Sequence, residues 1–552
     1  MKTFREIEYI RPDFEAEKQN IKAYIEAIPS AKNYEELSAL FHAREQEAAK
    51  FDQMYWVAFI RNTMDARDAF YEEELMKFNQ AFGELDVLKQ EAAQKLLESP
   101  YLDELEQEIG SSHVNAMKGQ QRTTSPEVAE DMLQDSKLHQ AYNKVVSANS
   151  ANLGKLMKQM NSMDREERAE GLQKWAGLYE EMAPDLDNIY DQMMEVRTRY
   201  AQKLGFEGYI PYIYTKYGRD DYNPENLKVL RKKIKDYIVP ICEQLYKEQK
   251  ERLGVDTLTW HDEMLTDPDG NATPYGTKDE MLEAAREMYH ELSKETGEFF
   301  DFMMEHDLFD LESRTGKQPG GYCELLAADN APFIFANFNG TSADVDVLTH
   351  EAGHAFEAYM ASPNCPAKST VFAHYEVAEI HSMAMEYFTY PWMEKFFGDR
   401  AEQYRVRHLE QCIKNLPFMV CVDEFQHRAF ENQLDAAGRR RLWKELEETY
   451  MPWRTYDGNE FLENGGLWMH KLHIFITPFH YIEYVLAQIC ALQLYELMLM
   501  DKETAWEKYC ALCKVGGKLG YFKTLEHVGL KNPFAEGTVE HLAEFLKECF
   551  NQ

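Results

Sequence analysis

The sequence predicts a mostly α-helical fold with one small β-sheet. Residues 1 to about 200 are rich in Glu, Lys, Ala, Leu, Met and Gln, which are strong helix formers, in long amphipathic stretches. No fixed-period repeat is present, so a solenoid is not predicted. One later segment, residues 316–340, departs from the helical pattern. Helical hairpins are therefore the simplest interpretation of the first 200 residues.

Prolines mark the expected breaks in this first region. Each lies beside a residue that favours turns or caps, and they are Pro29, Pro100, Pro126 and Pro184. Near residue 205 glycines and aromatic residues become denser. We therefore expect one helical domain over residues 1–200 and a second domain over residues 201–552.

Two short strands are predicted in the segment that departs from the helical pattern. Residues Tyr322–Leu326 and Pro332–Phe338 read as strands, and the turn residues Ala328-Asp329-Asn330 separate them. An isolated sheet presents an edge, and an edge can pair with an extended peptide. We expect the second strand, near residues 333–338, to pair with such a peptide.

The charge of the chain excludes some partners. Lys and Arg total 60 against 96 Asp and Glu, which gives a formal net charge of −36. Such a surface repels phosphate backbones and anionic lipid headgroups, so we expect no nucleic-acid and no membrane partner. The first residues, MKTFREIEYIRPDFEAE, are charged where a secretory signal would be apolar, and no uninterrupted apolar run reaches 18 residues. A cytoplasmic protein is expected, and its oligomeric state is not indicated.

A His-Glu-x-x-His motif follows the predicted strands. His350 and His354 are four residues apart, so on a helix they share one face and can both direct a ring nitrogen to one metal ion. Zinc suits two imidazoles with a carboxylate as third ligand. Glu351 is rotated by about 100° from His350, which places its carboxylate beside the open metal position. That is the place for a general base.

The surrounding residues indicate that this helix is buried on one side. An apolar stripe recurs at steps of three and four residues and comprises Val345, Leu348, Ala352, Ala355 and Tyr359. The two histidines project from the opposite side with Val347 and Ala358. A solvated face would carry Lys and Glu instead, so the helix is expected to form the wall of a cleft.

A second helix offers the third metal ligand. The stretch VFAHYEVAEIHSMAMEYF contains Glu376, Glu379 and Glu386, and its Ala and Met residues indicate burial. A buried carboxylate needs a partner, and a metal ion is a good one. We choose Glu379, although spacing alone does not separate it from Glu376.

These segments resemble the thimet oligopeptidase and oligoendopeptidase F family of zinc metallopeptidases, and the oligoendopeptidase F branch most closely. The resemblance covers most of residues 205–552, through FNGTSADVDVLTHEAGHAF, EIHSMAMEYF, GKQPGGYC and HIFITPFHYIEYVLAQ. It implies a closed helical shell around a deep substrate channel, with residues 1–200 as channel wall or lid. It also implies one Zn²⁺ per chain on His350, His354 and a glutamate about 25 residues further on, which is Glu379. Glu386 would orient one of the histidines.

The resemblance also suggests donors in the C-terminal part of the chain. His473 and Tyr484 match the family's histidine and tyrosine that face the scissile carbonyl, and Tyr481 is a further candidate. Neutral donors of this kind stabilise the oxyanion of peptide hydrolysis. His480 stands where oligoendopeptidase F relatives usually carry tyrosine. We expect substrate contacts from His480 and from four residues of the predicted sheet region, Gly321, Tyr322, Phe335 and Asn337.

The implied activity is zinc-dependent hydrolysis of internal bonds in short, unstructured oligopeptides, with Glu351 as base. Two alternatives remain. A zinc carboxypeptidase of similar helical shape would need a cation for the terminal carboxylate, and Arg407, Arg439 or Lys518 could serve. A non-catalytic peptide-binding protein could retain a structural zinc, although Glu351 would then have no purpose.

Overall fold

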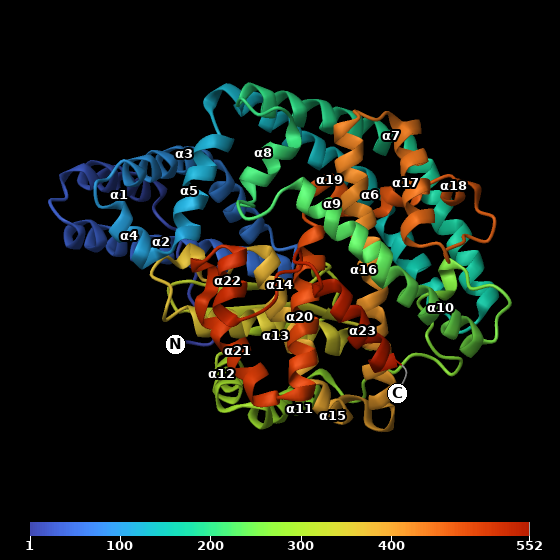
Figure 1. Ribbon diagram of the computed structural model, residues 1–552. Helices are drawn as coiled ribbons and strands as arrows, with labels where there is room; N and C mark the ends of the chain where they lie inside the picture. Colours follow the sequence, from blue (N-terminus) through green and yellow to red (C-terminus); the bar gives the residue numbers. More distant parts are fainter. Residues whose placement is uncertain (551–552) are drawn as a thin grey trace. The chain divides into compact units, whose positions relative to one another are not determined.

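Helices make up most of the structure, a computed structural model that describes residues 1–550 (Figure 1). The chain forms two compact units, each assembled from three segments. Helices α5 (Ser111–Thr123), α16 (Ala401–Glu431) and α20 (Ile482–Met500) contribute residues to both units. The expected division into a wall or lid over residues 1–200 and a catalytic domain over 201–552 is a functional one and stays a prediction.

The first unit comprises residues 1–121, 272–404 and 490–531. It contains the β-sheet and the helix with the His-Glu-x-x-His motif. Its elements are α1 (Phe14–Ala27), α2 (Tyr34–Met64), α3 (Ala69–Leu97), α4 (Leu102–Ile109), most of α5 (Ser111–Thr123), α11 (Lys278–Leu292), α12 (Lys294–Glu305), β1 (Phe309–Glu312), β2 (Tyr322–Leu326), β3 (Ala331–Phe338), α13 (Ala343–Ala361), α14 (Tyr375–Phe388), α15 (Glu394–Phe397), most of α20, α21 (Lys502–Val515) and α22 (Tyr521–Val528).

The second unit comprises residues 122–271, 405–489 and 532–552. Residues 551 and 552 lie outside the described part of the chain. It is helical throughout its described part. Its elements are α6 (Ala129–Met160), α7 (Arg165–Lys203), α8 (Tyr209–Lys216), α9 (Pro224–Lys233), α10 (Val239–Leu253), most of α16, α17 (Ala436–Tyr450), α18 (Glu460–Glu463), α19 (Leu472–Ile476), the start of α20 and α23 (Thr538–Phe550).

Three of the four predicted breaks are confirmed. Pro29 lies in a 3₁₀ turn after α1, Pro100 follows the end of α3, and Pro126 opens a 3₁₀ turn before α6. The break at Pro184 is wrong, because α7 continues through it. A proline inside a helix costs about 3 kcal/mol, but α7 packs along α6 and buries Ala183 and Leu186 beside the proline, which offsets that cost.

The sheet has three strands in the order β1-β3-β2. The two predicted strands are β2 and β3, which pair antiparallel, with Tyr322 opposite Phe335. The additional strand β1 pairs parallel with β3, with Asp310 also opposite Phe335. Because β3 is the central strand, its backbone is already paired on both sides at Phe335. A peptide therefore cannot pair with β3 at Ile334 and Phe335. The side of β3 that pairs with β2 has no strand partner among the described residues at positions 336–338, so pairing of a peptide there stays a prediction.

Helix α13 crosses α14 at a very close distance. A Cβ atom on Gly353 would lie 2.6 Å from the backbone oxygen of His381 and 2.6 Å from the Cα of Ser382. Only glycine permits this approach. The predicted apolar stripe is confirmed at four positions, because Val345, Leu348, Ala352 and Ala355 are fully buried, while Tyr359 is half-buried. Ala358, expected on the other side, is buried as well, so α13 is enclosed on most of its surface.

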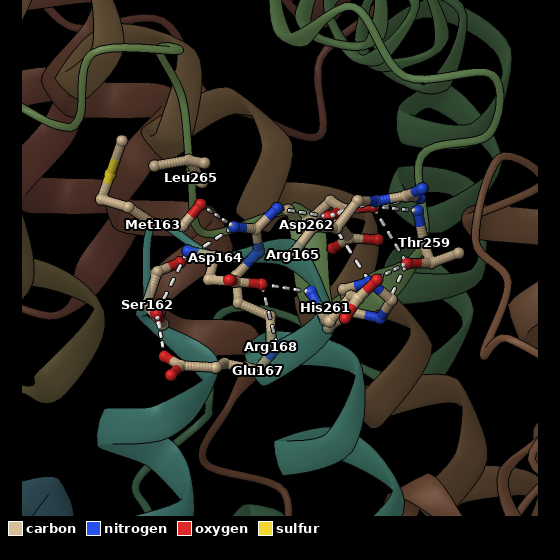
Figure 2. A network of polar contacts seen from close by, with 12 residues as sticks. Ser162, Met163, Asp164, Arg165, Glu167, Arg168, Thr259, His261, Asp262 and Leu265 are labelled. Atoms are coloured by element: carbon tan, nitrogen blue, oxygen red, sulfur yellow. Dashed lines mark hydrogen bonds and ion pairs between the residues drawn. The ribbon is translucent and has the colours of Figure 1, made fainter.

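A buried ionic network joins the start of α7 to the segment near residue 260 in the second unit (Figure 2). Asp262 is fully buried and accepts hydrogen bonds from Nη2 of Arg165 at 2.9 Å and from Nη2 of Arg168 at 2.7 Å. Nη1 of Arg168 also donates to the backbone oxygens of Ser162 and Met163, which lie between α6 and α7. Although burial raises the pKa of Asp262, the two arginines lower it to about 2. One carboxylate therefore holds the α6–α7 turn in place.

Helix α20 is long and apolar enough to cross a membrane by length and composition, with a mean hydropathy of 1.3. However, 67% of this stretch is buried inside the protein. A helix that is apolar all round is typical of a protein core as well as of a membrane span.

Candidate metal centre and donor cluster

Three predicted metal ligands converge in the first unit. His350 and His354 lie one turn apart on α13, and Glu379 faces both from α14. The Oε2 atom of Glu379 is 3.4 Å from Nε2 of His350 and 3.7 Å from Nε2 of His354. One potential ligand atom from each residue lies within 4.8 Å of the other two. Two imidazoles and one carboxylate at this spacing fit a zinc ion with one position left open.

Neighbouring side chains orient these groups. Nδ1 of His350 donates a hydrogen bond to Oε1 of Glu386 at 2.6 Å, which leaves Nε2 directed toward Glu379. The hydroxyl of Ser382 donates to Oε2 of Glu379 at 3.1 Å. Partners of this type fix the tautomer and the ring orientation of a metal-binding histidine. Glu376, the other candidate ligand, is also buried on α14 but is absent from this cluster.

The charges at the site suit a divalent cation. Burial lowers the pKa of His354 to about 4, so its ring is neutral, as a metal ligand must be. Burial raises the pKa of Glu379, but the hydrogen bond with His350 and the nearby histidines lower it to about 2. Burial also lowers the pKa of His350, yet Glu379 and Glu386 outweigh it and raise that pKa well above its ordinary value. The two carboxylates thus attract positive charge to this point, and a metal ion would supply it in place of a proton.

Glu351 is buried beside the cluster. Burial raises the pKa of its carboxyl to about 7, against the lowering effect of His350. No hydrogen bond or ion pair engages this carboxylate among the described residues. A Cβ atom on Gly321 would lie 3.5 Å from Oε1 of Glu351, so the glycine brings the exposed loop before β2 close to the carboxylate. A buried carboxylate without a partner is free to accept a proton.

The four sheet residues expected to contact substrate have different roles. Phe335 is fully buried and stacks on Tyr322, with ring centres 4.7 Å apart. The hydroxyl of Tyr322 is bonded to Thr63 at 2.6 Å. Asn337 donates to the backbone oxygen of Gly320 at 2.8 Å and so holds the glycine-rich loop. Only Gly321 is both exposed and adjacent to Glu351, and the expectation for buried Phe335 is wrong.

Sequence reasoning missed Lys317. Its ammonium is buried under Phe335, 4.3 Å from the ring centre. It donates to the backbone oxygens of Asp310, Glu312 and Ala336 at 2.9, 3.0 and 2.5 Å. Lys317 thus ties β1 and β3 to the loop that carries Gly321. The signal available in the sequence was a single lysine in the glycine-rich stretch GKQPGGYC.

Comparisons with known proteins agree with this geometry. Residues 158–544 match the family described as peptidase family M3, and residues 4–124 match the peptidase M3 N-terminal domain. The chain belongs to peptidase family M3. The predicted resemblance is therefore confirmed.

Solved structures of other peptidases share the fold of this chain. It is 38% identical to PZ peptidase A with a TM-score of 0.93, and the match covers 99% of both chains. It is 36% identical to a candidate oligoendopeptidase F from Bacillus anthracis str. Ames with a TM-score of 0.88, covering 100% of this chain and 98% of that one. The prediction of a mostly helical fold with a small sheet beside the motif helix is confirmed.

Another relative matches over a shorter stretch. An oligoendopeptidase F homolog from Borreliella burgdorferi (strain ATCC 35210 / DSM 4680 / CIP 102532 / B31) is 25% identical over 244 residues. The match covers 43% of this chain and 40% of that relative, so it spans less than half of the relative's length.

The three predicted donors cluster in the second unit of this M3 peptidase. The ring centre of Tyr481 lies 4.9 Å from that of His473 and 5.5 Å from that of Tyr484. Burial lowers the pKa of His473 to about 4, so its ring is neutral. Its Nδ1 atom is buried without a hydrogen-bond partner among the described residues. His473 is therefore a neutral group with unused hydrogen-bonding capacity.

His480 positions Tyr484. Nδ1 of His480 is hydrogen-bonded to Glu483, which is in turn paired with Arg219 at 2.7 Å. Nε2 of His480 then faces the hydroxyl of Tyr484 at 3.2 Å. The histidine at this position thus occupies a buried chain of polar contacts, whereas direct substrate contact by His480 stays a prediction.

Proposed function

We propose that this chain is a zinc-dependent endopeptidase that hydrolyses internal bonds of short, unstructured oligopeptides. One Zn²⁺ per chain would be held by His350, His354 and Glu379. The observation that carries the proposal is the convergence of these three groups beside Glu351, a buried carboxylate without a partner. Membership of peptidase family M3 supports peptide substrates. A cytoplasmic location is part of this proposal.

Each residue contributes one part of the chemistry. A zinc ion, when bound, supplies Lewis acidity that polarises the scissile carbonyl and lowers the pKa of water toward neutrality. Glu351 removes a proton from the attacking water and delivers it to the leaving amine. Glu386 holds His350 in the tautomer whose Nε2 can bind a metal.

The donor cluster stabilises the developing oxyanion. His473 would supply a ring N–H from its neutral imidazole, and Tyr484 would supply a hydroxyl whose oxygen lies 3.2 Å from Nε2 of His480. Tyr481 is the further donor, because no hydrogen bond engages its hydroxyl among the described residues. Donors fixed in a low-dielectric setting are worth about 3 kcal/mol each in stabilising such a charge.

Reconstitution of the metal-free protein tests the proposal. With one equivalent of zinc, the wild type should cleave a pool of peptides of about 5 to 20 residues at internal bonds and leave an added folded protein intact, as read by mass spectrometry. A ladder that shortens one residue at a time would instead indicate a carboxypeptidase. Full zinc occupancy without any cleavage would leave a binding protein.

A carboxypeptidase would need a cation for the terminal carboxylate of its substrate, and the structure gives other partners to the three that the sequence suggests. Arg439 is buried between Asp187 and Asp191, and Arg407 is paired with Asp267 at 2.9 Å. Lys518 donates to the backbone oxygen of Asn364 at 3.1 Å. Arg439 and Arg407 are therefore already paired with carboxylates, whereas Lys518 has this one backbone contact and no carboxylate partner among the described residues.

A further inference from the structure

The second unit contains a polar cavity of about 350 Å³. Residues from α10, α16 and the segments near residues 260, 454 and 470 line it. Its wall includes two aromatic rings, Phe418 and Tyr481, and Tyr481 also belongs to the donor cluster. The cavity therefore adjoins the groups proposed to act on the scissile carbonyl.

Two of the three cations in the cavity wall are neutralised by acidic neighbours. Arg454 pairs with Glu263 at 2.6 Å. Lys414 donates to Oε1 of Gln249 at 2.8 Å and lies 3.4 Å from a carboxylate oxygen of Glu410. These groups are buried and satisfied, as buried charges generally are.

Lys471 is the exception. Its ammonium lies 4.5 Å from the ring centre of Tyr481 and 5.5 Å from that of Phe418. Among the described residues no carboxylate pairs with it and no hydrogen bond engages it. The chain has 96 acidic residues, so a half-buried ammonium with no acidic partner is unexpected. Burial lowers the pKa of Lys471 to about 8, yet most of it remains protonated at pH 7.

The position of Lys471 relates it to a bound peptide. Tyr481 lies between Lys471 and His473, and the two ring-centre distances place the ammonium within about 10 Å of the His473 ring. An extended chain rises about 3.3 Å per residue, so this span corresponds to roughly three residues. A group at Lys471 would therefore belong to the same short peptide as a carbonyl at His473.

We propose that Lys471 binds a carboxylate of the peptide substrate about three residues from the cleaved bond. The carboxylate is either the C-terminus or an acidic side chain. An ammonium and a carboxylate form a charge-assisted hydrogen bond, and two aromatic walls keep bulk water from competing for it. The inference rests on the proposed function and names its substrate class, which is peptides that carry an anion on one side of the scissile bond.

Three versions of one cleaved peptide distinguish the sources of the carboxylate. The first ends in a free carboxylate, the second in an amide, and the third in an amide with Asp placed three residues from the cleaved bond. We expect kcat/KM of the wild type to be at least tenfold higher for the free acid than for the amide, through KM. A kcat/KM for the Asp peptide that equals that of the free acid would show that a side-chain carboxylate can replace the C-terminal one.

Variants assign the preference to Lys471. Lys471→Met keeps the aliphatic stem against the two rings and should reduce the acid-to-amide ratio to about 1, whereas Lys471→Arg should retain it. Lys444→Met, which removes one exposed charge in the same unit, is the control and should keep the wild-type ratio. An unchanged ratio in Lys471→Met, or no preference in the wild type, would overturn the inference.

Binding separates this inference from the proposed function. Zinc-loaded Glu351→Gln should bind the labelled free-acid peptide more tightly than its amide, as read by fluorescence anisotropy, even if cleavage fails for other reasons. Cleavage of all three peptides at equal rates, with equal binding, would support the endopeptidase but contradict the binding of a substrate carboxylate by Lys471. Preferential binding of the acid without cleavage by the wild type would instead contradict only the enzymatic proposal.

Discussion

Single residues decide the metal chemistry of this chain, and Glu386 illustrates how. It binds no metal in the proposed site, but it accepts the Nδ1 proton of His350 at 2.6 Å. Glu386→Gln removes the negative charge and weakens that contact while preserving the shape of the side chain. We expect zinc affinity to fall by about 10- to 100-fold, measured by competition with a chelator. An affinity equal to that of the wild type would show that Glu386 does not orient the histidine.

Lys471 predicts a specific pH dependence. As pH rises through about 8 the ammonium loses its charge, so the acid-to-amide ratio of kcat/KM should fall by up to about tenfold between pH 7 and pH 9. The neighbouring His470 and His473 both have a pKa of about 4, and that of Tyr481 is raised, so these three do not titrate in this range.

The variant Lys471→Met is the control for titration of the other charged groups of the cavity. Lys414, Glu263 and Arg454 keep their own partners, and all three remain in Lys471→Met. That variant should therefore show a flat ratio from pH 7 to pH 9. A ratio that still falls with pH in Lys471→Met would assign the effect to another group.

At the scale of elements, the contact between α13 and α14 places Glu379 opposite the two histidines. Gly353→Ala would put a methyl carbon 2.6 Å from the backbone oxygen of His381 and so push the helices apart. We expect a loss of about 2 kcal/mol or more in the free energy of unfolding, measured with urea, and weaker zinc binding. Gly83→Ala is the control, because Gly83 is an exposed residue of α3 and no atom lies within 4 Å of a Cβ at that position. This variant should raise the free energy of unfolding by about 0.5 to 1 kcal/mol. Equal stability of the two variants would contradict the close contact.

The network around Asp262 makes a second prediction at this scale. Asp262→Asn leaves Arg168 buried without its counter-charge, so we expect a loss of about 3 kcal/mol in the free energy of unfolding at pH 7. The folded-state pKa is lowered from 3.8 to about 2, so this stability is present above about pH 4 and is lost as pH falls toward 2. The difference in the free energy of unfolding between Asp262→Asn and the wild type, measured with urea, should become smaller as pH falls over that range.

A matched control for this network is available on α7. Asp185→Asn changes an exposed aspartate of the same helix and should shift stability by less than about 0.5 kcal/mol. A small effect of Asp262→Asn, similar to that of the control, would show that the network does not hold the α6–α7 turn.

The elements show why part of the fold could be predicted and part could not. Local signals predicted β2, β3 and the helix with His350 and His354, because periodicity and turn residues lie within a few positions of one another. The short strand β1 was missed, since its four residues become a strand only by pairing with β3. The same long-range pairing made β3 the central strand and occupies both of its sides at Phe335, where the local sequence predicts an edge.

At the scale of the whole molecule, the ion pairs and hydrogen bonds of a cation decide whether it can bind a substrate carboxylate. The sequence alone does not show these contacts. The sequence suggests Arg407, Arg439 and Lys518 as partners of a substrate carboxylate, and in the structure each of them contacts another group of the chain. Lys471 was overlooked because nothing in the local sequence shows that an ammonium lacks a partner. The metal ligands could be predicted from the sequence more readily, since two of them lie in one motif and the third follows on the next helix.

The central claim is that Glu351 is the base of a zinc endopeptidase. Its most direct test compares the wild type with Glu351→Gln at equal, measured zinc occupancy on one cleaved oligopeptide. We expect the variant to keep its zinc and its affinity for the peptide, and to lose about 10²- to 10⁴-fold in kcat because no group takes the proton from water. A variant that cleaves at the wild-type rate would contradict the account.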